Sequence, residues 1–271
     1  MYLNFWGLKE KPFENTPDPR FLYYSLQHEE ALSRLLYVVR ERKGAGMLTG
    51  VFGCGKTLLA HTLLRELGGD IYRIALINNP KLSHIELLMD IALKLGASNL
   101  PARKTDVLTN LLLDSINEIL QDNLKDGKET VIIIDEAHVI KDEDVWDELR
   151  LLLNFQSEDK FLLSLLLLGQ PELRKIIEAN KPLLQRITIK SRLESLSETD
   201  TSFYILHRLK IAGREKEIFT KGTIPLIHKQ SGGIPRRINQ ICDMALFAGF
   251  GKKAKSIDEK IIQEVMKGLE E

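Results

Sequence analysis

Hydrophobic and polar positions along the chain follow two periods, one typical of buried strands and one typical of amphipathic helices. Five short apolar runs indicate strands, and between them apolar residues recur every three or four positions, which predicts helices with one core-facing side. The expected strands cover residues 45–49, 71–77, 130–134, 161–168 and 187–189, and the expected helices cover 27–42, 58–67, 83–95, 105–124, 143–155, 173–177 and 181–185. Ser83 and Thr105 are the expected N-caps of two of these helices. This order predicts an α/β fold with a five-stranded parallel sheet and helices on both faces.

The pattern changes at about residue 195. Four helical segments follow without a further strand, at 197–212, 223–230, 235–248 and 256–269, which predicts an all-α lid domain. The first 27 residues are rich in aromatic residues and proline, so we expect their side chains to pack on the folded body rather than form a solvated tail. The expected divisions are an N-terminal segment and helix packed on the core (1–43), an α/β domain (44–194) and the helical lid (195–271).

Composition narrows the class of protein. With 271 residues, of which 44% are hydrophobic and 28% charged, the chain can bury a sizeable core. Lys plus Arg and Asp plus Glu are equal at 38 each, so no net field attracts nucleic acid or an anionic membrane. The longest apolar run, 161–168, is far shorter than the roughly 20 residues of a membrane span, and the N-terminus lacks a signal-peptide pattern. We therefore expect a cytoplasmic protein, in which two cysteines suggest neither a disulfide framework nor a metal cluster.

The most specific chemistry lies in residues 50–57, Gly-Val-Phe-Gly-Cys-Gly-Lys-Thr, which fit G-x-x-x-x-G-K-[ST] at each fixed position. A strand is expected before this run and a helix after it, as a phosphate-binding loop requires. The glycines let backbone N–H groups surround a phosphate, Lys56 would reach its oxygens, and Thr57 would bind Mg²⁺. The expected nucleotide-binding residues are Gly50, Gly53, Cys54, Gly55, Lys56, Thr57 and Leu58, with ATP or ADP and Mg²⁺ as ligands.

Two expected strands end in polar side chains. Asp135 and Glu136 follow the run 130–134, and Gln170 follows the strand 161–168. Ligands bind beyond the carboxyl ends of parallel strands, so we expect Asp135 to complete the magnesium shell and Glu136 to polarise the attacking water. Gln170 could orient that water or sense the γ-phosphate, although such a residue taken alone is more often a plain turn residue.

Two arginines are candidates to supply positive charge to the transition state in addition to Lys56 and Mg²⁺. A phosphoryl-transfer transition state spreads negative charge over several oxygens, beyond what Lys56 and Mg²⁺ neutralise. Arg186 directly precedes the strand 187–189, and Arg236 begins the third lid helix. An arginine considered by itself is expected on the solvated surface.

In combination, these residues resemble the AAA+ ATPases. That family joins a phosphate loop to an apolar strand ending in Asp-Glu, a polar sensor, an arginine finger before the fifth strand, and a second sensor arginine in a helical lid. The matching positions are Asp135-Glu136, Gln170, Arg186 and Arg236. The resemblance implies ATP hydrolysis with these residues and Lys56 in catalytic roles. It also implies that Arg186 acts on the nucleotide of a neighbouring subunit in a ring or dimer.

Residues 2–36 are similar to the opening of one secretion-associated branch, the ExeA or general secretion pathway protein A type, with relatives in MSHA-pilus and exosortase systems. The shared features include Phe5-Trp6-Gly7-Leu8 and Thr16-Pro17-Asp18-Pro19, and later Gly169-Gln170-Pro171-Glu172-Leu173. This resemblance implies a role in assembling a bacterial envelope machine, such as a type II secretion, pilus or exopolysaccharide system, through a protein partner. Val51-Phe52 depart from the Glu-Val of that branch and Leu58 from a frequent threonine, which leaves nucleotide binding expected and the hydrolysis rate open.

Longer relatives of this type continue into a membrane helix and a periplasmic peptidoglycan-binding domain. The chain is therefore expected to be either a cytoplasmic-only member or a piece of a longer protein. At the inner membrane it would be held by a partner or by a C-terminal anchor outside this sequence.

Two other functions stay open. A DNA-associated AAA+ regulator of transposition or replication would use basic spots such as Arg236-Arg237 and 252–255, against which the balanced charge argues. A nucleotide-gated switch would bind ATP but hydrolyse it slowly. The histidines His28, His61, His138 and His207 lack metal-ligand spacing and are expected to be structural.

Overall fold

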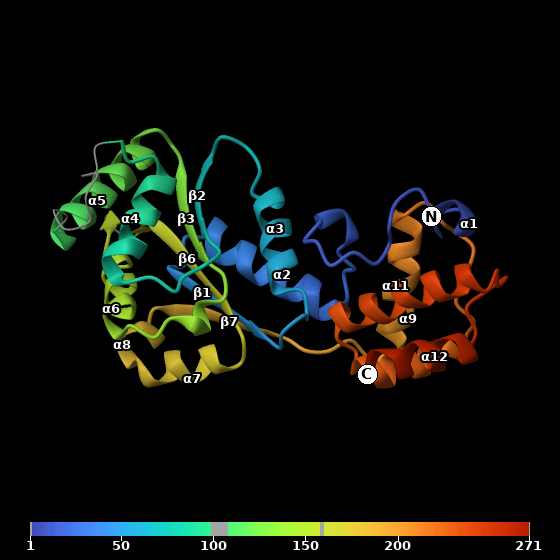
Figure 1. Cartoon of the computed structure of the whole chain (residues 1–271). Coiled ribbons are helices and arrows are strands. Elements are labelled where there is room, and N and C mark those ends of the chain that lie inside the picture. The colour runs from blue at the N-terminus through green and yellow to red at the C-terminus, as the bar shows by residue number, and fades with distance from the viewer. Residues whose placement is uncertain (1, 99–107, 158–159, 271) are drawn as a thin grey trace. The chain divides into compact units, whose positions relative to one another are not determined.

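The computed structural model describes residues 2–98, 108–157 and 160–270, and it consists of two compact units (Figure 1). The sheet unit comprises Glu29–Gly50 and Thr62–Leu193, and the helical unit comprises Met1–His28, Val51–His61 and Glu194–Glu271. The helices α2 (Leu26–Arg40) and α3 (Lys56–Glu66) contribute residues to both. The N-terminal segment, the phosphate loop and the C-terminal helices thus belong to one compact unit. The division expected at residues 43 and 194 stays a prediction.

Five parallel strands form the sheet, in the order β2-β3-β6-β1-β7. Their bounds are β1 Ala45–Gly50, β2 Tyr72–Ile77, β3 Glu129–Ile134, β6 Leu163–Gly169 and β7 Ile187–Leu193. Every residue of β1 and β6 is buried, because these central strands are covered on both faces. The predicted α/β fold with a five-stranded parallel sheet is confirmed.

Helices cover both faces of this sheet. One face carries α4 (His84–Leu95), α5 (Thr109–Lys125) and α6 (Glu143–Leu152), whose apolar sides share one buried cluster with the strands. On the other face, Leu35 and Val38 of α2 approach Gly46 of β1 so closely that a side chain there would touch both. The short helices α7 (Glu172–Ala179) and α8 (Lys181–Leu184) follow β6.

Several local boundaries differ from the sequence expectation. Ser83 is the N-cap of α4 in a full capping box, whereas Thr105 lies outside the described residues and α5 begins after Leu108. The run 161–168 is divided, because β5 (Lys160–Phe161) pairs with β4 (Gln156–Ser157) and Leu162 donates to the Phe155 carbonyl. An apolar run does not reveal where its hydrogen-bonding partner changes. The edge strand β7 extends to Leu193, beyond the predicted 189. The prediction was too short because exposed polar residues alternate with buried ones along this strand, so it has no continuous apolar run.

The helical unit contains the four predicted helices, α9 (Glu198–Ile211), α10 (Thr223–Ser231), α11 (Pro235–Gly251) and α12 (Glu259–Glu270). The last begins three residues later than expected, because Ile257 forms a parallel bridge beside Phe219. Within the described ranges, no helix combines the length and apolar character that crossing a bilayer requires.

The N-terminal segment packs on these helices. It contains α1 (Tyr2–Trp6) and a 3-10 turn, η1 (Pro19–Phe21). Trp6, Phe13 and Phe21 are buried in one apolar cluster with α9, α11 and α12, and the Trp6 indole donates to the Leu246 carbonyl at 2.9 Å. The expectation that the aromatic residues pack on the folded body is met in this unit.

Arg208 of α9 holds the N-terminal segment in place through hydrogen bonds and a contact with an aromatic ring. It is 3% exposed, donates to the carbonyls of Pro12 and Glu14 and to the Tyr204 hydroxyl, and lies 4.7 Å from the Phe21 ring centre. A buried guanidinium is stable only when its donors are used in this way.

We expect Arg208→Met to lower the free energy of unfolding by about 2–4 kcal/mol, because it leaves the buried Pro12 carbonyl without a donor and removes a stacked cation. Urea titration followed by circular dichroism measures the change. Lys210→Met, at an exposed position of the same helix, is the matched control. An equal loss in both variants would contradict the anchoring role.

Candidate functional site

The phosphate loop, residues 51–55, takes a conformation that depends on two glycines. Gly53 has φ 84° and Gly55 φ 103°, in the left-handed region that favours glycine. The Cys54 N–H donates to the Val51 carbonyl at 3.3 Å, and the Lys56 ammonium donates to the same carbonyl at 3.2 Å. Lys56 is only 4% exposed, so its charge is held against the loop, and Thr57 and Leu58 follow it in the first turn of α3.

His28 supports this loop from within the helical unit. Its Nε2 lies 3.0 Å from the Cys54 carbonyl and its Nδ1 lies 2.7 Å from the Ser25 hydroxyl. A carbonyl only accepts, so Nε2 carries the proton and Nδ1 accepts from Ser25. Burial lowers the pKa of His28, which favours this neutral form. His28 thus has a structural role, as expected, and this role is to hold the phosphate loop in place. The only feature of the sequence that pointed to it was its place in the N-terminal signature.

The structure brings Arg236 to the same loop. Its backbone N–H, in the first turn of α11, donates to the Gly53 carbonyl at 3.2 Å, so the loop satisfies one of the helix's free N–H groups. A Cβ on Gly53 would stand 2.8 Å from the Cβ of Arg236. The guanidinium lies 4.5 Å from the centre of the Phe52 ring. The predicted lid arginine and the predicted phosphate loop are therefore in direct contact.

An apolar pocket lies beside the loop in the same unit. It is lined by Leu22, Tyr23 and His28 of the N-terminal part, by Cys54, Gly55 and Leu58, and by Leu196, Tyr204 and Pro235 of the C-terminal part. Such a surface suits a flat heteroaromatic ring.

In the sheet unit, the carboxyl edge is formed by the ends of β1, β6 and β3, which are parallel neighbours. Asp135 and Glu136 follow β3 at this edge, and Gln170 follows β6. Asp135 is 4% exposed, and one of its oxygens accepts the Glu136 N–H at 2.9 Å. Glu136 has φ 53°, an unusual value for a non-glycine residue, at the point where the chain leaves β3.

His138 joins the two polar strand ends. Its Nδ1 lies 3.3 Å from the backbone N–H of Gln170, which donates to it, and 3.4 Å from the Glu136 carboxylate. The structure thus brings Glu136, His138 and Gln170 together at the carboxyl edge. From its place just after Asp135-Glu136, the sequence predicts that His138 has a supporting role near the site rather than a catalytic one.

Arg186 lies at the opposite edge of the sheet. Its carbonyl accepts from the N–H of Ala45, the first residue of β1, and its guanidinium donates to the Asn154 side chain at 2.8 Å. A six-residue strand spans about 20 Å, so Arg186 is remote from the acidic side chains at the carboxyl edge of its own sheet. Thr57 and Asp135, the expected magnesium ligands, belong to different units, and their shared role stays a prediction.

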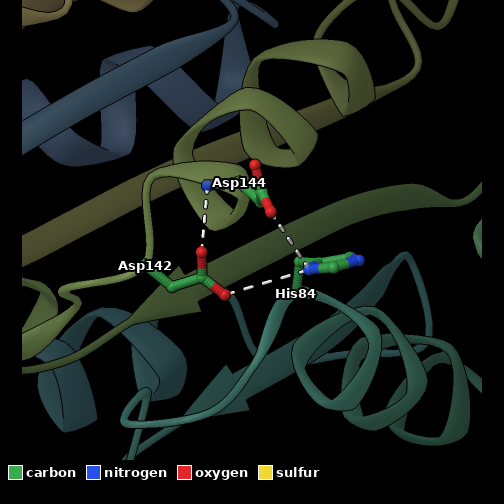
Figure 2. A group of neighbouring side chains, drawn as sticks. All are labelled: His84, Asp142 and Asp144. Atoms are coloured by element: carbon green, nitrogen blue, oxygen red, sulfur yellow. Dashed lines mark hydrogen bonds and ion pairs between the residues drawn. The ribbon is translucent and has the colours of Figure 1, made fainter.

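A second polar group, His84, Asp142 and Asp144, connects two helix starts in the sheet unit (Figure 2). The His84 Nδ1 lies 3.8 Å from Asp142 and 3.9 Å from Asp144, and Asp142 also caps α6 by accepting the Asp144 N–H. The three ligand atoms lie within 4.8 Å of one another, a spacing that a metal ion could bridge. Carboxylates at a helix N-terminus are favoured without an ion, so we assign this group to holding α4 against α6.

Comparisons with known proteins show the family of the chain. A model of the AAA domain family matches residues 39–177, just over half of the chain. Over 262 residues the chain is 41% identical to general secretion pathway protein A of Aeromonas hydrophila. The aligned region covers 95% of this chain and 46% of that relative. The chain thus spans about half the length of the curated relative it matches, and the resemblance expected from its N-terminal signature is confirmed.

Solved structures support the fold. The ORC2 protein of Aeropyrum pernix, in its ADPNP and ADP complexes, matches with a TM-score of 0.71 at 18% identity, over 96% of this chain and 71% of that one. Cdc6p of Pyrobaculum aerophilum matches with a TM-score of 0.72 at 17% identity, over 93% of this chain and 70% of that one. From the family match, the strand order and the phosphate loop, we conclude that the chain belongs to the AAA domain family.

Proposed function

We propose that the chain binds ATP or ADP with Mg²⁺ and hydrolyses ATP. The observation that carries the proposal is the phosphate loop, whose two left-handed glycines lead directly into α3. Such a loop directs backbone N–H groups and a helix N-terminus toward an anion. Lys56 would bind the β- and γ-phosphate oxygens, Thr57 and Asp135 would hold Mg²⁺, and bound Mg²⁺ would neutralise charge on the phosphates.

The group at the carboxyl edge supports hydrolysis as well as binding. Glu136 would accept a proton from the attacking water, or polarise it. His138 accepts the Gln170 N–H and would keep the end of β6 beside Glu136. Gln170 would orient the water or contact the γ-phosphate. The apolar pocket beside the loop would take the adenine, and Arg236 would contact the phosphates from the lid. Phosphate release by the purified chain with Mg²⁺ tests the proposal, and turnover no faster than that of heat-denatured protein would reject hydrolysis.

We infer that Arg186 completes the site of a neighbouring subunit. Its place at the amino edge of its own sheet, held by Asn154, supports action in trans. The active form would then be a ring or another nucleotide-dependent oligomer. Light scattering with and without a non-hydrolysable ATP analogue tests this, and a monomer under both conditions would reject it.

Arg186→Ala should spare nucleotide affinity and remove turnover, about 10³-fold or more, because the finger stabilises only the transition state. Analogue binding and phosphate release at equal protein concentration measure the two effects. Arg174→Ala, at an exposed arginine on α7 paired with Glu178, is the matched control. Lost binding in the Arg186 variant alone would contradict the trans role.

The cellular role that we propose is the assembly of a bacterial envelope machine through protein contacts, from the cytoplasmic side and at the inner membrane through a partner or an anchor outside this sequence. Its support is the 41% identity to general secretion pathway protein A. Cells that carry Glu136→Gln in place of the wild-type residue should accumulate unassembled subunits of that envelope machine. Normal assembly in these cells would reject the role.

The two alternatives give different results. A DNA-associated regulator would bind duplex DNA at low salt with a steep salt dependence, whereas balanced charge predicts no binding. A slow switch would bind the analogue and oligomerise, yet release phosphate no faster than the Glu136→Gln variant.

A further inference from the structure

Phe52 is the feature of the phosphate loop that the motif leaves unexplained. It occupies a variable position, yet it is a large apolar side chain that is 57% exposed. A ring that is not buried can still contribute to stability through the contact of its face with a cation. The Arg236 guanidinium, 4.5 Å from its centre, is such a contact.

A hydrogen bond to the loop fixes the position of the Arg236 backbone. Gly53, next to Phe52, accepts the Arg236 N–H, and the absence of a side chain at Gly53 allows the Cβ of Arg236 to come this close. What the backbone does not fix is the long arginine side chain, which has several rotatable bonds. In the described ranges the guanidinium of Arg236 makes no ion pair and no hydrogen bond to another side chain, so the ring is what restricts it.

The contact with the ring leaves the arginine able to bind phosphate. The central carbon of the guanidinium lies over the ring, 4.5 Å from its centre. A guanidinium has five N–H donors, more than a single ring can engage, so donors remain for an anion. A lysine would offer three donors on one compact charge instead of this fork.

We propose that Phe52 is a positioning residue that holds the Arg236 guanidinium beside the phosphate loop, ready for the terminal phosphate of ATP. This inference rests on the proposed nucleotide site and adds a residue to it. Phe52 touches the arginine rather than the reacting atoms, so its effect passes through Arg236 alone. The aromatic residue at position 52 would therefore favour ATP over ADP.

The first test does not need turnover. In the full 271-residue chain, the side-chain Nε–H signal of Arg236, assigned by its loss in Arg236→Lys, should be displaced by the ring current of Phe52. Phe52→Leu, which keeps an apolar side chain of similar size, should abolish the displacement, and Phe52→Tyr should restore it. An Nε–H signal that is the same in all three proteins would overturn the proposal.

The second test asks whether the ring acts through the arginine. An exposed cation–π contact corresponds to a factor of about two to five in binding. Phe52→Leu should weaken a non-hydrolysable ATP analogue by that factor and leave ADP unchanged, Phe52→Tyr should bind like wild type, and Phe52→Leu should add nothing in an Arg236→Ala background. Equal weakening of both nucleotides, or additive losses in the double variant, would mean that Phe52 only shapes the loop. A wild-type chain that binds neither nucleotide rejects the proposed function, and this inference with it, whereas binding with additive losses rejects the inference alone.

Discussion

We expect Lys56→Ala to abolish binding of ATP and ADP, with a loss of affinity of about 100-fold or more, because the ammonium supplies charge-assisted hydrogen bonds to phosphate. The ammonium is buried against the loop, where it donates to the Val51 carbonyl, and it would exchange this contact for phosphate oxygens. Charge-assisted hydrogen bonds to phosphate are about twice as strong as neutral ones, and alanine removes both the charge and its donors. Calorimetric titration with each nucleotide in the presence of Mg²⁺ measures the loss.

The loop itself should survive this substitution. The Val51 carbonyl keeps the Cys54 N–H as a donor, and His28 still holds the Cys54 carbonyl, so the circular dichroism spectrum should match the wild type. Lys81→Ala, at an exposed position, serves as the control and should bind normally. Wild-type affinity in the Lys56 variant would show that the loop is not the nucleotide site.

Glu136→Gln is expected to remove ATP turnover while nucleotide binding stays within about threefold of wild type. Gln has the same shape but cannot accept a proton from water, and loss of such a general base costs about 10²–10⁴-fold in rate. The substitution keeps the size of the side chain in its left-handed backbone position, so little rearrangement of β3 is expected. Phosphate release over a range of ATP concentrations gives the rate, and analogue titration gives the affinity.

Two comparisons make this result specific. Glu172→Gln changes an exposed glutamate of α7 in the same unit and should leave turnover unchanged. His138→Asn should lower the rate less than Glu136→Gln, because it removes the acceptor of the Gln170 N–H and not the carboxylate itself. Equal turnover in wild type and Glu136→Gln would remove Glu136 from the mechanism and leave the chain as a nucleotide-gated switch.

Several features could be predicted because their causes are local in sequence. The glycines of the phosphate loop, the buried run before Asp135-Glu136 and the capping box at Ser83 depend on neighbouring residues only. The run at 161–168 shows the limit of such reasoning. Its apolar character predicted a strand, but the hairpin Gln156–Ser157/Lys160–Phe161 depends on which backbone groups are left to pair.

Other features depend on residues far apart in the chain. His28 reaches the Cys54 carbonyl, Asn154 holds Arg186, and His84 faces the start of α6. No spacing along the sequence encodes these contacts, because each depends on how separate elements pack. The sequence therefore predicts a structural role for His28 and a supporting role for His138, and the contacts of each side chain become known only from the fold.

By itself, the sequence determined the phosphate loop, the acidic strand end, the parallel α/β fold and the family. Each of these depends on residues close together in the chain, through the backbone freedom of glycine, the hydrophobic period or the spacing of a motif. Only the tertiary structure decided which side chains meet. It placed Arg186 at the sheet edge opposite Glu136, and it stacked Arg236 on Phe52 of the loop. The physical reason is that strand order and helix packing set these distances through long-range burial, which no short stretch of sequence specifies.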